Sequence, residues 1–328
     1  MRERLLPLAV VGVASWIVYG CGGSTGMDTG AAGDTGTTGS GGSVGAAGGG
    51  GTTATAGSGG SAGSGGRAGG TGVAGSTGAT GGNGSTGTGG GGAAAPSCTW
   101  PTPASTVMLS ATQTISGTYD GGMRRFVGTG PLGSSSQNED QGALFNVANG
   151  GTLQNVVLGN PAADGVHCEG TCTLKNVWWE DVGEDAATLQ GSSPTQVMTI
   201  DGGGARAAAD KVFQHNGPGT MIIRNFCAQD FGKLYRSCGN CDMQYARNVQ
   251  VQNVIVIPGS GTSSLVGVNA NYNDTATFSA ITIRARANSV TICTRYTGNN
   301  TGAEPTSVGS GADGTVCKYA ASDITWMP

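Results

Sequence analysis

Acidic side chains are scarce in this chain and gather where they could bind a metal ion. Charged residues make up 11% of the 328 positions, yet Asp164 is followed 20 and 21 residues later by Glu184 and Asp185. A further acidic pair, Glu139 and Asp140, lies upstream. Converging carboxylates repel one another unless a cation neutralises them, and hard oxygen ligands favour Ca²⁺ over Zn²⁺. The spacing therefore predicts a calcium site on one outer face, with solvated turn residues as the alternative interpretation.

Basic side chains form a second group at nearly the same period. Lys211 and Lys233 are 22 residues apart, and Arg236 follows three residues later. If the chain stacks at that period, the two lysines are neighbours on adjacent turns. Cations beside carboxylates that bind metal suit a polyanionic ligand, which would contact calcium on one side and Lys or Arg on the other. Unrelated surface ion pairs are the alternative.

These residues can meet only if the chain winds at their spacing, and the sequence repeats at that spacing. From residue 150 onward, short β-branched runs recur, the first four at spacings of 21 to 25 residues and the last two at longer intervals. The recurring runs are 152–156, 173–177, 197–201, 221–226, 249–255 and 278–283. A unit this short cannot bury its own apolar face, so the units must stack. Because no helical period and no strong two-residue hairpin turn is found, we predict an all-β parallel β-helix with about three short strands per turn, rather than a β-sandwich.

Several polar and aromatic residues of the repeats are expected to serve the fold. Asparagines recur within the runs at 155, 176, 225 and 253, and we expect them at one corner, where Asn tolerates a left-handed backbone. Trp178 and Trp179 must point to opposite sides of a strand, one into the core and one outward. The outer ring could stack on sugar or pack under a loop. His167 and His215, the only two histidines, are expected to be turn or ladder residues, and Gly202–Gly204 a corner.

The N-terminal part of the chain is expected to direct export and not to fold. Residues 1–20 begin with Arg2 and Arg4 and continue as an apolar run, which is typical of a signal peptide. Gly20 followed by Cys21 is similar to a bacterial lipoprotein cleavage site; a plain signal peptide is the alternative. Residues 22–97 contain little besides Gly, Ser, Thr and Ala, so they are predicted to be a disordered linker. Residues 98–328 are then the single folded domain.

Cysteine usage agrees with an exported protein. If Cys21 carries lipid, eight of the nine cysteines remain, all after residue 97. An even number in an exported domain suggests up to four disulfides. The closely spaced pairs Cys168/Cys172 and Cys238/Cys241 are the expected local bridges, with a zinc site as the alternative for the second. A net charge of −4 argues against a nucleic-acid partner, which would require a basic stripe.

Four segments resemble the pectate lyases of polysaccharide lyase family 3. The segments are SQNEDQGALF (136–145), PAADGVHCEGTCTLKNVWWEDVGEDAATLQG (161–191), DKVFQHNG (210–217) and NFCAQDFGKLYRSCGNC (225–241). The resemblance covers roughly residues 104–320. It implies a right-handed parallel β-helix and Ca²⁺-dependent cleavage of polygalacturonate by β-elimination.

The resemblance also implies roles for individual residues. Asp164, Glu184 and Asp185, completed by Glu139, match the calcium ligands of the family. Asp181 and Asp210 are weaker candidates for additional ions. Lys211 matches the position proposed as the base. Lys233 and Arg236 match positions assigned to substrate binding and charge stabilisation.

These residue types suit an elimination. The proton at C5 of a uronate is poorly acidic, and a metal ion on the neighbouring carboxylate would withdraw the developing charge. An ordinary lysine has a pKa of about 10.4. Such a lysine is mostly protonated at neutral pH and cannot act as a base. The nearby cations Lys233, Arg236 and Ca²⁺ are expected to lower the pKa of Lys211, and we expect the activity to have an alkaline pH optimum.

Two other functions remain open from the residues alone. A polygalacturonase-type hydrolase would use paired carboxylates and would leave the lysines unexplained. A non-catalytic pectin-binding β-helix would not require the basic cluster. We further expect a monomer, located outside the cell or on a bacterial surface and attached to the membrane only through lipid at Cys21.

Overall fold

The computed structural model describes residues 96, 98–138 and 140–328. The expected signal peptide, Cys21, Glu139 and all of the expected linker except Pro96 lie outside the described residues. Among the described residues, no helix is long and apolar enough to cross a membrane.

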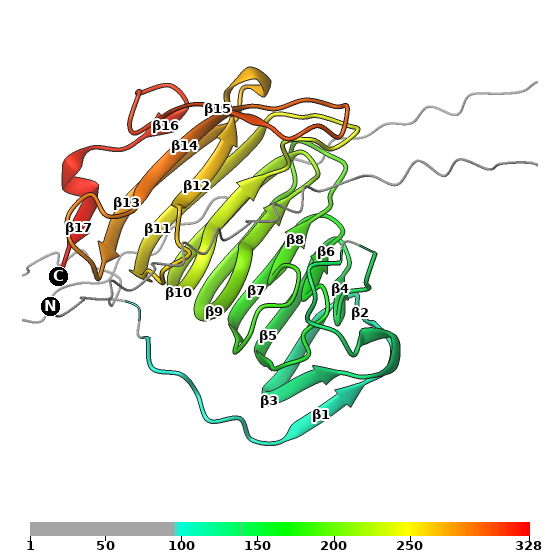
Figure 1. The fold of residues 1–328 in the computed structure, drawn as a ribbon. Coiled ribbons are helices and arrows are strands. Elements are labelled where there is room, and N and C mark those ends of the chain that lie inside the picture. The colour runs from blue at the N-terminus through cyan, green and yellow to red at the C-terminus, as the bar shows by residue number, and fades with distance from the viewer. Residues whose placement is uncertain (1–95, 97, 139) are drawn as a thin grey trace, which may run out of the picture. The chain divides into compact units, whose positions relative to one another are not determined.

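The described chain is a right-handed parallel β-helix whose strands join into one continuous sheet (Figure 1). One series of parallel strands runs the length of the stack: β1 (Thr106–Leu109), β3 (Thr118–Gly128), β5 (Gly151–Leu158), β7 (Cys172–Trp179), β9 (Val197–His215), β10 (Gly219–Ser237), β11 (Arg247–Ile257) and β13 (Thr275–Ile283). All six of the predicted recurring runs lie in strands of this series. The predicted fold class is therefore confirmed.

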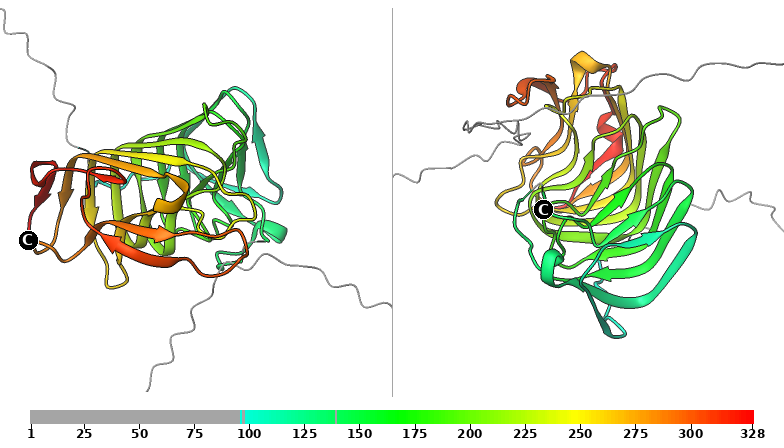
Figure 2. Two further views of the ribbon diagram at one scale, coloured as in Figure 1. Left: turned by 90° about the horizontal axis from the view of Figure 1, so that it is seen from above. Right: turned by 90° about the vertical axis from the view of Figure 1, so that its right-hand side faces the viewer.

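A second series of shorter strands forms the face that carries the charged residues. It consists of β2 (Gln113–Ile115), β4 (Phe145–Val147), β6 (Val166–Cys168), β8 (Ala187–Leu189), the C-terminal parts of β9 and β10, β12 (Ser264–Asn269) and β14 (Thr291–Thr297). Each coil therefore crosses from the first face to this one, as the two further views show (Figure 2). The repeat pattern in the sequence did not reveal these strands, because most are only three residues long.

Short elements complete the described chain. They are β15 (Thr306–Ser310), which runs antiparallel to β14, then β16 (Cys317–Lys318), β17 (Ile324–Trp326) and the 3-10 turns η1 (Gly130–Leu132), η2 (Ala270–Tyr272) and η3 (Ala321–Asp323).

The core is a column of aliphatic and aromatic side chains at equivalent positions on successive coils. One row of the column consists of Leu153, Leu174, Ile200, Ile223, Val251 and Phe278, which pair in register and are all buried. Burial of each such side chain contributes about 1.5–3 kcal/mol. Trp179 lies inside and packs against Phe213 at 5.9 Å between ring centroids. Trp178 points outward but is covered by Trp100, 5.2 Å away, so it packs under a chain segment and is not available to sugar.

Asparagines form the predicted ladder at one corner of the coils. Asn155, Asn176, Asn225 and Asn253 all have φ between 51° and 55°, the left-handed conformation that Asn tolerates. Their side chains bond to one another, since Asn176 donates to Asn155 at 2.9 Å and Asn253 donates to Asn225 at 2.8 Å. Gly202, with φ of 77°, takes this corner between Asn176 and Asn225. The expectation that 202–204 forms a corner is thus confirmed.

Replacing Asn176 with alanine is expected to lower the free energy of unfolding by about 2–4 kcal/mol, and replacing it with glycine by less. Alanine is penalised in the left-handed region by about 1–2 kcal/mol. Both replacements also lose the bond to Asn155 and the bond that Trp178 donates to Asn176 at 2.8 Å, worth about 1 kcal/mol each. Denaturant unfolding of the two variants measures the difference. Equal losses for alanine and glycine would show that the backbone conformation is not what requires asparagine here.

All eight cysteines of the folded region are paired. Cys168–Cys172 and Cys238–Cys241 are the two predicted local disulfides, which excludes a zinc site at Cys238 and Cys241. Cys98–Cys227 closes a loop across a sequence separation of 129 and fastens the N-terminal segment to β10. Cys293–Cys317 joins β14 to β16. Disulfides of this number are typical of proteins that fold in an oxidising compartment.

Candidate active site

The charged residues singled out in the sequence lie on adjacent coils where each chain segment enters the second face. Asp164 precedes β6, Glu184 and Asp185 precede β8, and Lys211 lies in β9. Backbone bonds from Val166 to Ala186 and from Ala186 to Val212 align these segments, and Lys211 pairs in register with Lys233 of β10. The predicted spacing of about one coil therefore brings them together.

Tight backbone contacts hold the two acidic segments in place. Gly165, with φ of 49°, leaves no room for a side chain, because a Cβ there would collide with the carbonyl oxygen of Ala186. A Cβ on Gly183 would likewise collide with the carbonyl oxygen of Ala163. Glycine at both positions thus allows the coils carrying Asp164 and Glu184 to approach closely.

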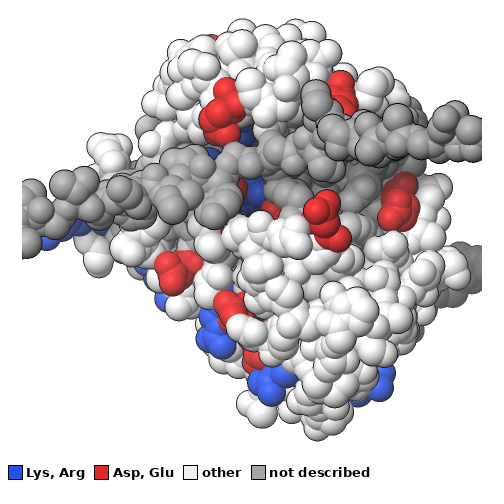
Figure 3. All heavy atoms as spheres, turned by 45° about the vertical axis from the view of Figure 1, so that its right-hand side comes forward, with Lys and Arg blue, Asp and Glu red and all other residues white. Residues whose placement is uncertain are grey.

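Three carboxylates form the centre of the site. One carboxylate oxygen from each of Asp164, Glu184 and Asp185 lies within 4.8 Å of the others. Their residues are only 7%, 3% and 2% exposed, so they are not the solvated turn residues of the alternative interpretation, nor are they on an open outer face. In Figure 3, a few acidic and basic atoms are recessed near the middle of the face shown, while other acidic side chains are scattered over its surface.

Burial and mutual repulsion disfavour three negative charges at this place. Burial is the main effect that raises the pKa of Asp164 to about 6, although the hydrogen bond from His167 opposes it. Burial also raises the pKa of Asp185 well above its ordinary value, against the opposing charge of Lys211. The Oδ1 atoms of Asp164 and Asp185 are buried without a hydrogen-bond partner. Such acceptors, with a net excess of negative charge, suit a divalent cation.

His167 is a ladder residue, as predicted, and it also touches the site. Its Nε2 lies 2.6 Å from Oδ2 of Asp164, and its backbone pairs with Thr188 on the next coil. Burial alone would lower the pKa of His167, but the hydrogen bond and charge of Asp164 raise it above the ordinary value. The spacing i, i+3 between the two residues was the available signal in the sequence.

Lys211 is the cation that faces the carboxylates. Its Nζ lies 3.2 Å from Glu184 and 3.7 Å from Asp185, and 3.1 Å from Asp210 on its other side. Asp210 also pairs with Lys233 at 3.3 Å. The charges of the two lysines lower the pKa of Asp210 although burial would raise it. Asp210 therefore links the lysines instead of joining the carboxylate cluster.

Arg236 lies one coil beyond Lys211, next to Gln214 in the register of the second face. Its guanidinium stacks over the ring of Tyr296, 4.0 Å from the centroid, and donates to Asn269 at 3.1 Å. Sequence reasoning missed both partners, because neither is charged and Asn269 is 33 residues away along the chain.

The weaker metal-ligand candidate Asp181 is not part of this cluster. Asp181 accepts a hydrogen bond from Asn160 and is absent from the set of converging carboxylates found among the described residues. Glu139 lies outside the described residues.

His215 is fully buried and bonded to the hydroxyl of Tyr235 at 2.8 Å, and burial lowers its pKa to about 3, so it is neutral.

A comparison with protein families matches residues 97–302 to the family described as pectate lyase. The chain belongs to the pectate lyase family. The match covers the coils that carry every charged residue of the site, so the expected family is confirmed. As a pectate lyase, the protein is a polysaccharide-cleaving enzyme that acts on pectate.

Relatives in fungi support the same assignment. The chain is 46% identical over 227 residues to a probable pectate lyase D of Emericella nidulans, an alignment that covers 67% of this chain and 83% of the relative. It is 48% identical over 220 residues to pectate lyase H of the same organism, covering 65% and 81%.

Solved structures of bacterial pectate lyases have the same fold. The catalytic domain of PelI from Erwinia chrysanthemi is 31% identical with a TM-score of 0.57, and the alignment covers 69% of this chain and 98% of that domain. PelI in complex with tetragalacturonic acid is 33% identical with a TM-score of 0.58, covering 67% and 70%. The chain is thus similar in sequence to fungal pectate lyases and in fold to bacterial ones.

Proposed function

We propose that this protein cleaves polygalacturonate by Ca²⁺-dependent β-elimination at the cluster of Asp164, Glu184, Asp185 and Lys211. The observation that carries the proposal is the position of the Lys211 amine, 3.2 Å from Glu184 in the only converging carboxylate set of the described residues. A base and an acidic metal site are thereby adjacent. That PelI binds tetragalacturonic acid supports an oligogalacturonate as the ligand of this site too.

Ca²⁺ suits the donors of the site. Asp164, Glu184 and Asp185 offer only oxygen, and two of these oxygens are buried without a hydrogen-bond partner. Glu139 is proposed as a further ligand from its position in the family motif. When bound, calcium would withdraw charge from the uronate carboxylate next to the reacting carbon.

The remaining groups act on the sugar. Lys211, as the free amine, is proposed to take the proton at C5. The electron pair of that C–H bond forms the C4–C5 double bond, and the bond from C4 to the glycosidic oxygen breaks. That oxygen leaves on the neighbouring sugar with the electron pair of the broken bond and takes up a proton from water. Lys233 and Arg236 are proposed to bind carboxylates of the polymer, since Arg matches a planar carboxylate with two parallel N–H donors.

One assay tests the reaction class. The soluble domain 98–328 would be incubated with polygalacturonate in the presence of calcium or of a chelator. We expect unsaturated-uronate absorbance with calcium only. Reducing ends without that absorbance would instead indicate a hydrolase, and binding with neither product would indicate a pectin-binding module.

Calcium affinity is expected to fall as the solution becomes acidic. The pKa of Asp164 is raised to about 6, so below that pH the ion must displace a proton, and affinity should weaken by about tenfold per pH unit for each proton displaced. Between about pH 4 and pH 6, Asp164 of the calcium-free folded protein keeps a proton that the same group has lost in the unfolded chain. The contribution of Asp164 to the stability of the calcium-free protein is therefore highest below about pH 4 and declines up to about pH 6. Calcium affinity changes in the opposite direction, because it increases over this range. Calorimetric titration with calcium from pH 5 to pH 8 measures the trend. A calcium affinity that does not change over that range would contradict it.

We further propose that the protein is exported, and that Cys21 carries the lipid that attaches it to a bacterial envelope. The four disulfides of the folded region support export, and Gly20-Cys21 after an apolar run supports lipidation. Expression of the full chain in a bacterium should place it in the membrane fraction, whereas a Cys21→Ala variant should not be retained there. We also propose a monomer, which size-exclusion chromatography with light scattering would test.

A further inference from the structure

Arg236 is held in a closely fitting slot. It is 9% exposed, its guanidinium lies over the ring of Tyr296 at 4.0 Å, and its Nη1 donates to Oδ1 of Asn269 at 3.1 Å. An arginine side chain that was free to rotate would lose about 2 kcal/mol of rotamer entropy on binding substrate. Here most of that freedom is already lost in the folded protein.

Two glycines shape the walls of this slot. A Cβ added to Gly267 would lie 2.9 Å from Cδ of Arg236 and 3.1 Å from the ring of Tyr296. A Cβ added to Gly239 would lie 2.5 Å from Nη2 of Arg236. Pro305 also crowds Gly239, where its Cγ would lie 2.3 Å from the added Cβ. Neither glycine has a positive φ among the described residues, so these close side-chain contacts, and not the backbone conformation, exclude a side chain there.

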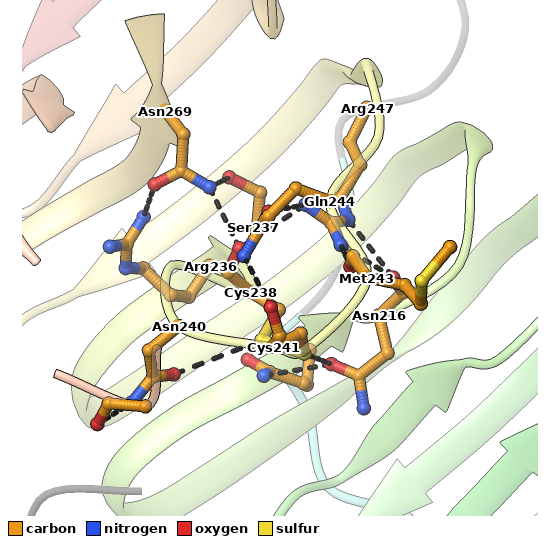
Figure 4. Close-up of a disulfide and its surroundings, with 12 residues drawn as sticks. Asn216, Arg236, Ser237, Cys238, Asn240, Cys241, Met243, Gln244, Arg247 and Asn269 are labelled. Carbon is orange, nitrogen blue, oxygen red and sulfur yellow. Dashed lines mark hydrogen bonds between the residues drawn. A yellow bond between two sulfur atoms is a disulfide. The ribbon is translucent and has the colours of Figure 1, made fainter. Parts of the chain in front are cut away.

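The amide of Asn269 is oriented by its other partners. Its Nδ2 donates to the carbonyl oxygen of Cys238 at 2.8 Å and to Oγ of Ser237 at 3.2 Å. Because both partners accept, Nδ2 must face them and Oδ1 must face Arg236 (Figure 4). The Cys238–Cys241 disulfide closes the short loop that presents this carbonyl.

A buried carboxylate fixes the far end of this arrangement. Ser237 donates its hydroxyl hydrogen to Asp274 at 2.5 Å, so its oxygen is left to accept from Asn269. Asp274 also accepts from the backbone N–H groups of Arg247 and Asn269. Ser237, Asn269 and Asp274 are all 0% exposed. Such polar residues in a core are tolerable only when every partner is in place, and then they define one geometry.

We propose that Asn269 is the positioning residue of Arg236: held by Ser237, Asp274 and the carbonyl of Cys238, it fixes the guanidinium toward the substrate carboxylate. This inference rests on the proposed function, because it assumes that Arg236 acts on a uronate. Within the described residues, the side-chain hydrogen bond of Arg236 uses only Nη1, which leaves further N–H donors for a bound carboxylate.

A double-mutant cycle tests the proposal. In full-length protein with polygalacturonate and saturating calcium, Asn269→Leu is expected to lower kcat/KM by about 10–100-fold, since small displacements of a binding group have effects of this size. In the Arg236→Ala background the same substitution should change nothing further, because Asn269 acts only through Arg236. The calcium-induced shift in Tm should be unaffected, since the three carboxylates lie on other coils. Binding of tetragalacturonate by calorimetry, which needs no turnover, should follow the same pattern.

A second variant keeps the test decisive if Asn269→Leu fails to fold. Gly267→Ala retains Asn269 and instead displaces Arg236 by contact with its Cδ, so it should impair the wild-type protein and be harmless in the Arg236→Ala background. Asn248→Leu, which removes an asparagine side chain that accepts a hydrogen bond from Thr275 at 2.6 Å, is the matched control and should remain active.

Three results would overturn the inference. Full activity of Asn269→Leu or of Arg236→Ala would exclude a positioning role. If Asn269→Leu lowered kcat/KM equally in the wild-type and Arg236→Ala backgrounds, the role of Asn269 would be merely structural. Absence of unsaturated product from the wild-type protein would overturn the proposed function itself, and the inference with it.

Discussion

Replacing Lys211 with alanine is expected to reduce kcat by about 10²–10⁴-fold while leaving calcium binding intact. A positioned general base contributes about 10²–10⁴-fold, and Lys211 is the amine that faces the carboxylates of Glu184 and Asp185, at 3.2 and 3.7 Å. Loss of its positive charge also removes a competitor for these oxygens, so calcium affinity should stay the same or increase. Unsaturated-product formation and calorimetric calcium titration measure the two effects.

Replacement of Lys211 with arginine separates a base from a simple positive charge. Arginine keeps the charge but stays protonated at any accessible pH, so Lys211→Arg should be nearly as inactive as Lys211→Ala. Lys175→Ala, which changes an exposed lysine of β7, is the matched control and should retain full activity. Substantial turnover by Lys211→Arg would assign the residue an electrostatic role, and substantial turnover by Lys211→Ala would remove it from the mechanism.

The Asp185→Asn variant is expected to lose calcium binding and yet be at least as stable as wild type when calcium is removed. Asp185 is the most buried of the three carboxylates, at 2% exposure, and burial raises its pKa well above the ordinary value. A neutral amide there avoids a buried charge close to Asp164 and Glu184. As a calcium ligand it is weaker, so we expect affinity to fall by about a hundredfold or more, beyond the 10–100-fold typical of residues that only support a ligand.

The opposite signs of these two effects make the test specific. Thermal unfolding with and without calcium should show an unchanged or higher Tm for Asp185→Asn without the ion and little increase on adding it. Activity should return only partly at high calcium concentrations. Asp242→Asn changes an exposed loop residue and is the control. This variant should keep the increase in Tm that calcium causes. A variant of Asp185 that still bound calcium as wild type does would exclude this residue as a ligand.

The sequence period predicted much of the site, because residues one repeat apart in the sequence lie at equivalent places on neighbouring coils of a β-helix. The 20 or 21 residues from Asp164 to Glu184 and Asp185 and the 22 from Lys211 to Lys233 each correspond to one coil. Residues one coil apart lie side by side wherever the intervening corners are regular, as the asparagine ladder makes them. The parallel fold, two of the four disulfides and the proximity of acids and lysines could therefore be predicted.

The environment of these residues could not be predicted in the same way. The period does not tell whether a carboxylate is open to water or buried, and the three carboxylates turned out to be buried. It also suggested an outward tryptophan that could stack on sugar, whereas Trp100, from the irregular N-terminal segment, covers Trp178. Coverage depends on segments outside the repeat, and these carry no periodic signal.

The sequence by itself thus determined which coil each functional residue occupies, and its motifs indicated the family. Only the tertiary structure decided that Asp210 bridges the two lysines and that Asn269 and Tyr296 hold Arg236. The reason is physical. Vertical position follows from a regular repeat of backbone hydrogen bonds, whereas side-chain partners depend on the path of loops whose lengths differ from coil to coil.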